Sequence, residues 1–344
     1  MKRLVLVFLL FALSACTPLM VQTAGTPPAG FQGPRLEQDA VISFDGARLG
    51  LTIWNAATGE PWAVVVAAHG MNDYANAFHF AAEDWAKQGV TTLAYDQRGF
   101  GRSPGRGIWA GDDLMVEDLR TVTALARAKY PNAVITVVGE SMGGSVAAAA
   151  FATDNPPAAD RLVLLSPGVW GFKAQPLPNK TLLWLAANFT GSKVYTPPRW
   201  LTDRIYPTDN REELIAMGRD KLMIWGARSD TLYGLVRLMD RAAKDVGEDR
   251  LPTFYLYGAN DDIIPKNAAF KAVKGLRPGD RSAYYAAGHH LLTRDKQRAV
   301  VIADILAFIR DPQAALPSGA PPIPGAGAKH AGPPGSPARQ SAGL

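Results

Sequence analysis

The sequence predicts an α/β fold: a mostly parallel central sheet with helices on both faces and an inserted helical cap. Short apolar runs alternate with helical patterns along most of the chain, and this alternation produces parallel sheets covered by helices. One long stretch, residues 167–247, interrupts it with helical segments and no clear strand. The composition, 344 residues of which 47% are hydrophobic and 19% charged, fits one large domain better than two.

The strands are predicted from short apolar segments bounded by turn residues. A hairpin comes first, because Val41–Phe44 and Leu49–Trp54 flank the turn signal Asp45-Gly46. Further strands are predicted at residues 63–68, 90–95, 134–138, 161–165, 253–257 and 281–285.

Three helices alternate with these strands, at residues 74–88, 112–130 and 295–310. The second has the clearest ends. Asp112 and Asp113 place negative charge at its first turn, and Pro131 follows its last residue.

The stretch 167–247 is expected to form the cap over the carboxyl edge of the sheet. Two of its segments, Thr181–Leu185 and Leu232–Met239, are unusually apolar. These side chains either pack the cap onto the core or, for a subset, line a hydrophobic substrate channel. The sequence leaves both interpretations open.

The N-terminus has the features of an export signal. Lys2-Arg3 precedes the apolar run Leu4–Leu13, which is too short to span a bilayer comfortably, and small residues lead to Cys16, the only cysteine. This pattern resembles the lipobox of bacterial lipoproteins. The resemblance implies a signal peptide over residues 1–15, an acylated Cys16, and a lipid-anchored protein of the cell envelope. Thr17 favours the outer membrane, facing the periplasm. The alternative is an ordinary signal peptide in which Cys16 has no role.

Two Pro/Gly-rich stretches flank the predicted domain, which we place at residues 38–312. Residues 16–37 are interpreted as a tether between the anchor and the domain. Residues 313–344 have few large apolar side chains, so we expect a disordered tail in which His330 has no role.

Charge and motif content exclude several functional classes. The net charge is +5, but the basic residues are scattered among acids, so nucleic-acid binding is not expected. Cys/His clusters with metal-ligand spacing and dinucleotide-binding glycine patterns are absent from the sequence, so we expect no metal and no cofactor. The oligomeric state cannot be predicted from the sequence.

A serine with the features of a nucleophile follows the strand 134–138. Gly139-Glu140-Ser141-Met142-Gly143 lies between this strand and a run of small residues with helical character. A sharp strand-to-helix turn projects a serine hydroxyl away from the sheet, toward a base and backbone N–H groups. The flanking glycines are needed because side chains would collide at such a turn.

An acid and a base for this serine are found in two later segments. Asp261 and Asp262 follow the strand 253–257, and Asp261 is preferred because it comes three residues after the strand-end glycine, Gly258. Asp262 is better explained as a turn-capping acid. His289 and His290 follow the last strand and precede the last helix, and either is a candidate base.

Taken together, these motifs resemble the α/β-hydrolase family, in particular its monoglyceride lipase, lysophospholipase and serine aminopeptidase-like branch. The resemblance covers residues 38–310 and is carried by Ala68-His69-Gly70, Asp96–Ser103, Gly139–Gly144 and the two later segments. It implies the order serine, acid, histidine, which excludes His69 and His79 as the base.

The resemblance also assigns the remaining site residues. The spacing H-x-L-x-x-D, read from His290, favours that histidine over His289. The loop Ala68-His69-Gly70-Met71 is similar to an oxyanion loop, so the N–H groups of Met71 and Met142 are expected to bind the developing negative charge. His69 would then order the loop. Asp96–Ser103 is expected to brace loops beside the site.

We therefore expect a serine ester hydrolase that acts through an acyl-enzyme. In this interpretation His290 deprotonates Ser141, and Asp261 orients the imidazole. The apolar cap and the lipid anchor favour monoacylglycerol or lysophospholipid substrates. The alternatives are a short-chain carboxylesterase, an aminopeptidase-like hydrolase, and a non-catalytic ligand-binding envelope protein.

Overall fold

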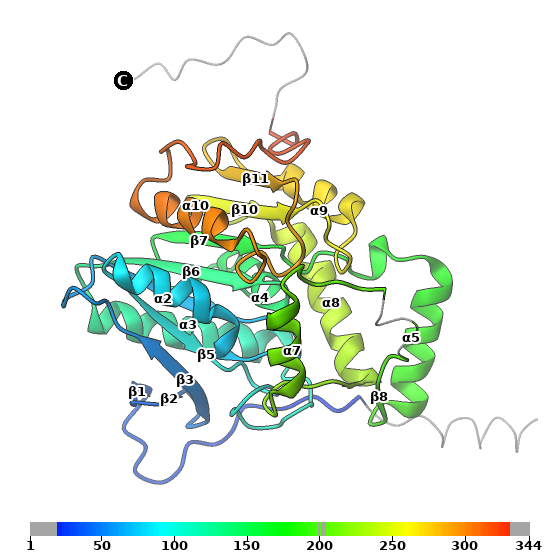
Figure 1. Cartoon of the computed structure of the whole chain (residues 1–344). Helices are drawn as coiled ribbons and strands as arrows, with labels where there is room; N and C mark the ends of the chain where they lie inside the picture. The colour runs from blue at the N-terminus through cyan, green and yellow to red at the C-terminus, as the bar shows by residue number, and fades with distance from the viewer. Residues whose placement is uncertain (1–18, 199, 201–203, 331–344) are drawn as a thin grey trace, which may run out of the picture.

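A nine-stranded sheet forms the centre of the molecule in the computed structural model, which describes residues 19–198, 200 and 204–330 (Figure 1). The strand order is β1-β2-β3-β5-β4-β6-β7-β10-β11. The first three strands pair antiparallel, and the six from β5 to β11 are parallel. The strands are β1 (Arg35–Leu36), β2 (Ala40–Ile42), β3 (Arg48–Trp54), β4 (Ala63–Ala68), β5 (Val90–Tyr95), β6 (Val134–Glu140), β7 (Arg161–Leu165), β10 (Thr253–Gly258) and β11 (Arg281–Tyr285).

Helices cover both faces of this sheet (Figure 1). One face packs against α3 (Asp112–Lys129), α4 (Met142–Phe151), α8 (Ser229–Asp245) and α9 (Lys266–Ala272). The other face packs against α2 (His79–Lys87), which follows the short helix η1 (Ala75–Phe78), and against α10 (Arg298–Arg310). Side chains of β4 alternate between the two resulting cores, as the period of a strand requires. The predicted α/β fold is confirmed.

The expected strands and helices occur close to their predicted positions, except that the last helix begins later than predicted. β4, β5, β7 and β11 have the predicted bounds. The last helix begins at Arg298 instead of Asp295, because the backbone turns on itself first: the N–H groups of Arg294 and Asp295 both donate to the carbonyl of Leu291.

The segment after β7 contains the cap, and the cap is shorter than expected. Its elements are η2 (Phe172–Ala174), α5 (Leu177–Thr190), α7 (Arg211–Arg219) and a small ribbon of β8 (Val194–Tyr195) and β9 (Ala227–Arg228). Helix α8, which we expected within the cap, instead packs on α4 in the layer that covers the sheet (Figure 1). Its apolar residues Leu235, Leu238 and Met239 are buried there.

The N-terminal segment, residues 19–37, is not the free tether that its composition suggested. The N–H of Gln22 donates to the carbonyl of Trp109, and the N–H of Gly25 donates to Asp45. The end of the segment forms strand β1 on β2. These contacts use backbone groups, which the side-chain composition does not reveal.

The C-terminal segment, residues 313–330, also differs from the expected disorder. It runs along the edge strand β11, where the N–H of Tyr284 donates to the carbonyl of Pro321 and the N–H of Ile323 donates to the Ser282 hydroxyl. Ile323 is buried in the core, and the ring of His330 contacts the carbonyl of Gly275. Leu316 also packs against the core, so apolar contacts and backbone hydrogen bonds together hold this Pro/Gly-rich segment. The rest of the predicted tail, 331–344, lies outside the described residues.

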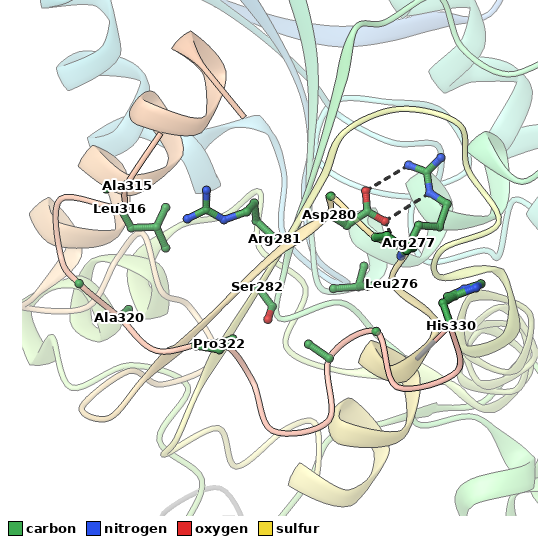
Figure 2. Close-up of a pocket in the computed structure, with 15 residues that line it drawn as sticks. Leu276, Arg277, Asp280, Arg281, Ser282, Ala315, Leu316, Ala320, Pro322 and His330 are labelled. Atoms are coloured by element: carbon green, nitrogen blue, oxygen red, sulfur yellow. Dashed lines mark hydrogen bonds and ion pairs between the residues drawn. The ribbon is translucent and has the colours of Figure 1, made fainter. Parts of the chain in front are cut away.

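Figure 2 shows the surface pocket between this segment and the start of β11, with the loop before that strand. Pro322 and Ala320 lie on one wall, and the ion pair of Arg277 with Asp280 lies on the other.

Within the part of the chain that the structure describes, we find no helix with the length and apolar character needed to cross a membrane.

Candidate active site

Ser141 lies at the turn between β6 and α4. Its φ of 52° and ψ of −114° place it in a left-handed conformation that residues other than glycine rarely adopt. Its N–H donates to the carbonyl of Leu165 at the end of β7, and its carbonyl accepts from the N–H of Gly168. The turn predicted from the sequence is therefore present, and the neighbouring strand holds it in its strained shape.

Close packing around this turn explains its glycines. A Cβ atom on Gly139 would lie 2.5 Å from the carbonyl oxygen of Gly143, and one on Gly143 would lie 1.9 Å from that of Ala68. Both distances are shorter than any non-bonded contact allows. A Cβ atom on Gly70 would lie 3.3 Å from the Cβ of Ser141, so the loop after β4 passes directly beside the serine.

The structure brings His290 and Asp261 together at the carboxyl ends of β10 and β11. His290 Nδ1 lies 2.8 Å from Asp261 Oδ2, and both side chains are buried. The other oxygen of Asp261 accepts the N–H groups of Ile263 and Ile264, each at 2.8 Å. The carboxylate is therefore fixed in place, and it orients the imidazole so that Nε2 is left to exchange a proton.

Two opposing effects act on the pKa of His290. Burial lowers it, but the charge of Asp261, its hydrogen bond and the charge of Glu140 together raise the pKa of this imidazole above its ordinary value. Asp261 therefore stabilises the protonated form of His290. A histidine that acts as a general base takes this form once it has accepted a proton.

The neighbouring candidates, Asp262 and His289, make other contacts. Asp262 accepts the N–H of Tyr206 from the cap. The N–H of His289 donates to Asp295, and its Nδ1 lies 3.6 Å from the same carboxyl group. Neither residue belongs to the hydrogen-bonded pair formed by His290 and Asp261.

A buried ionic network behind the serine was not predicted. Arg294 donates to Glu140 at 2.6 Å and to Asp73 at 2.7 Å, and all three side chains are buried. Burial raises the pKa of Glu140, and the charge of Arg294 opposes this shift. The available signal was Glu140 itself, a charged residue at the end of the otherwise apolar strand β6. The buried residue Arg294 gave no signal in the sequence.

The loop after β4 is held by His69. Its Nε2 accepts the N–H of Gln97 at 2.9 Å, so the proton is on Nδ1, which donates to the carbonyl of Gly70 at 2.7 Å. Burial lowers the pKa of this imidazole and favours the neutral form. These contacts agree with the prediction that His69 orders the loop.

Met71 and Met142, the two predicted oxyanion residues, lie on either side of Ser141. Met142 is the first residue of α4, where N–H groups have no partner within the helix. Met71 follows Gly70 in the loop that passes beside the serine. The oxyanion role of these two N–H groups stays a prediction.

The remaining expectations concern residues away from the reacting groups. In the segment Asp96–Ser103, Arg98 forms buried ion pairs with Asp45 and Asp118, and Asp96 accepts the N–H of Ala75. These contacts agree with a bracing role for that segment. Cys16 lies outside the described residues.

An open cavity of about 960 Å³ is lined by Asp261 and His289, whereas Ser141 and His290 are not among its lining residues. The cap residues Tyr206 and Leu214 line it on one side, and Asp261 lines it on the other. Helix α5, farther along the cap, exposes large apolar side chains: Leu177, Leu182, Trp184, Leu185 and Phe189.

Comparison with known proteins decides the family. Residues 59–297 match the model of the family described as serine aminopeptidase, S33. The chain belongs to this family. It is a hydrolase enzyme, and the confirmed fold is the α/β-hydrolase fold that the sequence motifs resemble.

Several relatives of the chain carry lipase names. The chain is 34% identical over 270 residues to a monoacylglycerol lipase of Mycolicibacterium smegmatis, covering 77% of this chain and 93% of the relative. It is 24% identical over 288 residues to a monoglyceride lipase of Mus musculus, covering 82% and 93%. These relatives support an ester hydrolase with a small lipid or ester substrate.

Among solved structures, a soluble variant of monoglyceride lipase from Saccharomyces cerevisiae, determined with a substrate analogue, shares the fold with a TM-score of 0.67. The match covers 85% of this chain and 100% of that chain at 17% identity.

Proposed function

We propose that this S33 hydrolase cleaves monoacylglycerol-like or lysophospholipid-like esters through an acyl-enzyme on Ser141. The observation that carries the proposal is the buried hydrogen bond of His290 with Asp261, formed at the sheet edge where the strained Ser141 turn also lies. A serine, an oriented imidazole and a carboxylate in this order are the groups that acyl transfer requires.

The proposed reaction has two steps at the same groups. His290 Nε2 takes the proton of the Ser141 hydroxyl, the oxygen attacks the ester carbonyl, and the alcohol leaves with the proton that His290 returns. Water, deprotonated by the same nitrogen, then attacks the acyl-enzyme, and His290 returns that proton to the Ser141 oxygen as the bond to it breaks and the acid is released. The N–H groups of Met71 and Met142 stabilise the negative oxygen in both steps.

Two features favour an acyl chain in the substrate. The relatives named above are monoacylglycerol and monoglyceride lipases. The cap also exposes apolar side chains on α5, such as Leu182 at 70% and Trp184 at 48%, which suit an apolar ligand better than a peptide. Short-chain esters and peptide substrates remain the alternatives that a test has to exclude.

The test is a series of p-nitrophenyl and glyceryl esters from acetyl to lauroyl, with an aminopeptidase substrate for comparison. Each buried CH₂ contributes about 0.8 kcal/mol, close to fourfold in affinity, so kcat/KM should rise toward medium or long chains. A maximum at acetyl would favour the short-chain esterase, and cleavage of the peptide substrate alone would favour the aminopeptidase.

Ser141→Ala tests the mechanism directly. Its activity should fall about 10⁴-fold or more, and a fluorophosphonate probe should no longer label the protein. Ser145→Ala is the matched control, because Ser145 is a buried serine one helical turn away whose hydroxyl donates to the carbonyl of Gly168. Wild-type protein that no fluorophosphonate labels would favour a non-catalytic binding protein.

We also propose that the protein is anchored by a lipid on Cys16 in the bacterial cell envelope, at the outer membrane facing the periplasm. The support is the sequence pattern of a basic start, an apolar run and small residues before the single cysteine. An enzyme tethered to a membrane meets lipid substrates at a high local concentration.

A further inference from the structure

Three side chains that can bind a metal meet beside the proposed catalytic pair. Asp209, His289 and Asp295 each direct one ligand atom to a common region, where these atoms lie within 4.8 Å of one another. Asp209 precedes α7 in the cap, whereas His289 and Asp295 belong to the loop between β11 and α10. The group therefore joins the cap to the loop that carries His290.

The buried carboxyl group of Asp295 points to a missing partner. The residue is fully buried, and its Oδ1 accepts no hydrogen bond among the described residues. His289 Nδ1 likewise has no hydrogen-bond partner there.

The spacing of these atoms fits two ligands of one cation. His289 Nδ1 and Asp295 Oδ1 are 3.6 Å apart, which is too long for a hydrogen bond. Around a tetrahedral zinc ion, ligand atoms at bond lengths of about 2.0–2.2 Å lie about 3.4 Å from each other. The observed separation therefore resembles the edge of a zinc tetrahedron.

Backbone groups orient both carboxylates. One oxygen of Asp209 accepts the N–H of Lys296 at 2.8 Å, and one oxygen of Asp295 accepts the N–H of His289 at 2.7 Å. Such outer contacts fix metal ligands in functioning sites. Asp209 and His289 also line the open cavity of about 960 Å³, which supplies a path from solvent.

We propose that Asp209, His289 and Asp295 bind a divalent transition-metal ion, with zinc as the best fit. One imidazole and two carboxylates suit zinc, whereas magnesium and calcium prefer oxygen ligands alone. The ion links the cap segment before α7 to the loop of His290 and stabilises their contact. This site is separate from the proposed ester hydrolysis and does not depend on it.

The experiment measures zinc binding and stability on purified, tag-free protein stripped with a chelator. The stripped protein is reloaded with zinc and then dialysed to remove the excess. We expect one zinc ion per chain by elemental analysis, and a higher melting temperature with zinc than without it. Asp209→Asn and His289→Gln should each weaken zinc affinity about 100-fold or more and abolish the stabilisation, while leaving the melting temperature of the metal-free protein nearly unchanged. Asp209 is exposed, so its variant should fold normally.

Two control variants make the result specific. Asp262→Asn changes a carboxyl group in the same cavity that lies outside the cluster. His79→Gln removes a histidine outside the cluster that also lies near an acid, with its Nε2 3.7 Å from Glu213. Both should bind zinc as the wild type does. The proposal is overturned if the wild type binds no stoichiometric zinc, if Asp209→Asn and His289→Gln bind it normally, or if His79→Gln alone loses it.

Discussion

Arg294 donates a hydrogen bond to Glu140 at 2.6 Å, and both side chains are buried. Glu140 directly precedes Ser141, and Arg294 comes four residues after His290. This ion pair therefore joins the turn of the proposed nucleophile to the loop of the proposed base. The second bond of the guanidinium, to Asp73, adds the loop after β4.

Removing Arg294 should destabilise the whole protein. Arg294→Met leaves Glu140 and Asp73 as unpaired buried acids, and breaking a buried ion pair in this way costs about 3–5 kcal/mol. Urea unfolding measures the loss. The control is Arg310→Met, because Arg310 lies at the surface over the ring of Trp62. Equal stability of the two variants would contradict this account of the network.

The pH dependence of the reaction should report the pKa of His290. The general base must be neutral, and the pKa of this imidazole is raised, so kcat/KM should fall as the pH drops through a value above the ordinary histidine pKa of about 6.5. Asp261→Asn removes the acid that raises it, so the acidic limb should move to lower pH. The pKa of the base can be measured from the rate at which a fluorophosphonate labels Ser141 at different pH values. An unchanged limb would exclude His290 as the titrating group.

Variants of adjacent residues test which of His289 and His290 is the base and which of Asp261 and Asp262 is the orienting acid. His290→Ala and Asp261→Asn should lower kcat by about 10³-fold or more, because they remove the base and its orienting acid. His289→Ala and Asp262→Asn should retain most activity when assayed without added metal. Esterase kinetics on the four purified variants decides the matter, and greater sensitivity of either neighbour would move the proposed site by one residue.

The C-terminal segment should contribute to stability. Ile323 is only 1% exposed and packs in the main core, so Ile323→Ala should cost about 2–5 kcal/mol in the free energy of unfolding. Ile215→Ala is the matched control, since Ile215 is 44% exposed on α7. If both variants unfolded at the wild-type urea concentration, the segment would not be a stable part of the domain.

Cys16→Ser should prevent lipidation. The unmodified protein should then remain unprocessed or leave the membrane fraction, because the anchor is missing. Mass spectrometry of the mature N-terminus provides the measurement, and Thr17→Ser serves as a control that keeps the cysteine. A wild-type N-terminus that is cleaved elsewhere and carries no lipid would refute the proposed anchor.

The sheet could be predicted because its signals are local. Strands such as Ala63–Ala68 are continuous apolar runs, and the α3 helix has acids at its start and a proline after its end. The glycines around Ser141 likewise indicate a sharp turn without any knowledge of distant residues. These signals place the serine, the acid and the histidine at strand ends.

Contacts between distant residues could not be predicted in this way. Helix α8 is apolar whether it belongs to the cap or to the layer over the sheet, and only its packing on α4 distinguishes the two. Asp209 is 80 residues from His289 in the sequence, so ligand spacing could not reveal their approach. In the sequence, Arg294 cannot be distinguished from a surface arginine. Its buried position is explained only by its ion pairs with Glu140 and Asp73.

The position of residues 313–330 along β11 has a consequence for synthesis. A ribosome makes residues 313–330 after β11, so the N–H of Tyr284 on this outer strand lacks its partner, the carbonyl of Pro321, until that segment has been made. A nascent chain that stops early would expose that strand to other unfinished copies. Once residues 313–330 are in place, they cover the edge of the sheet and keep it from pairing with other chains.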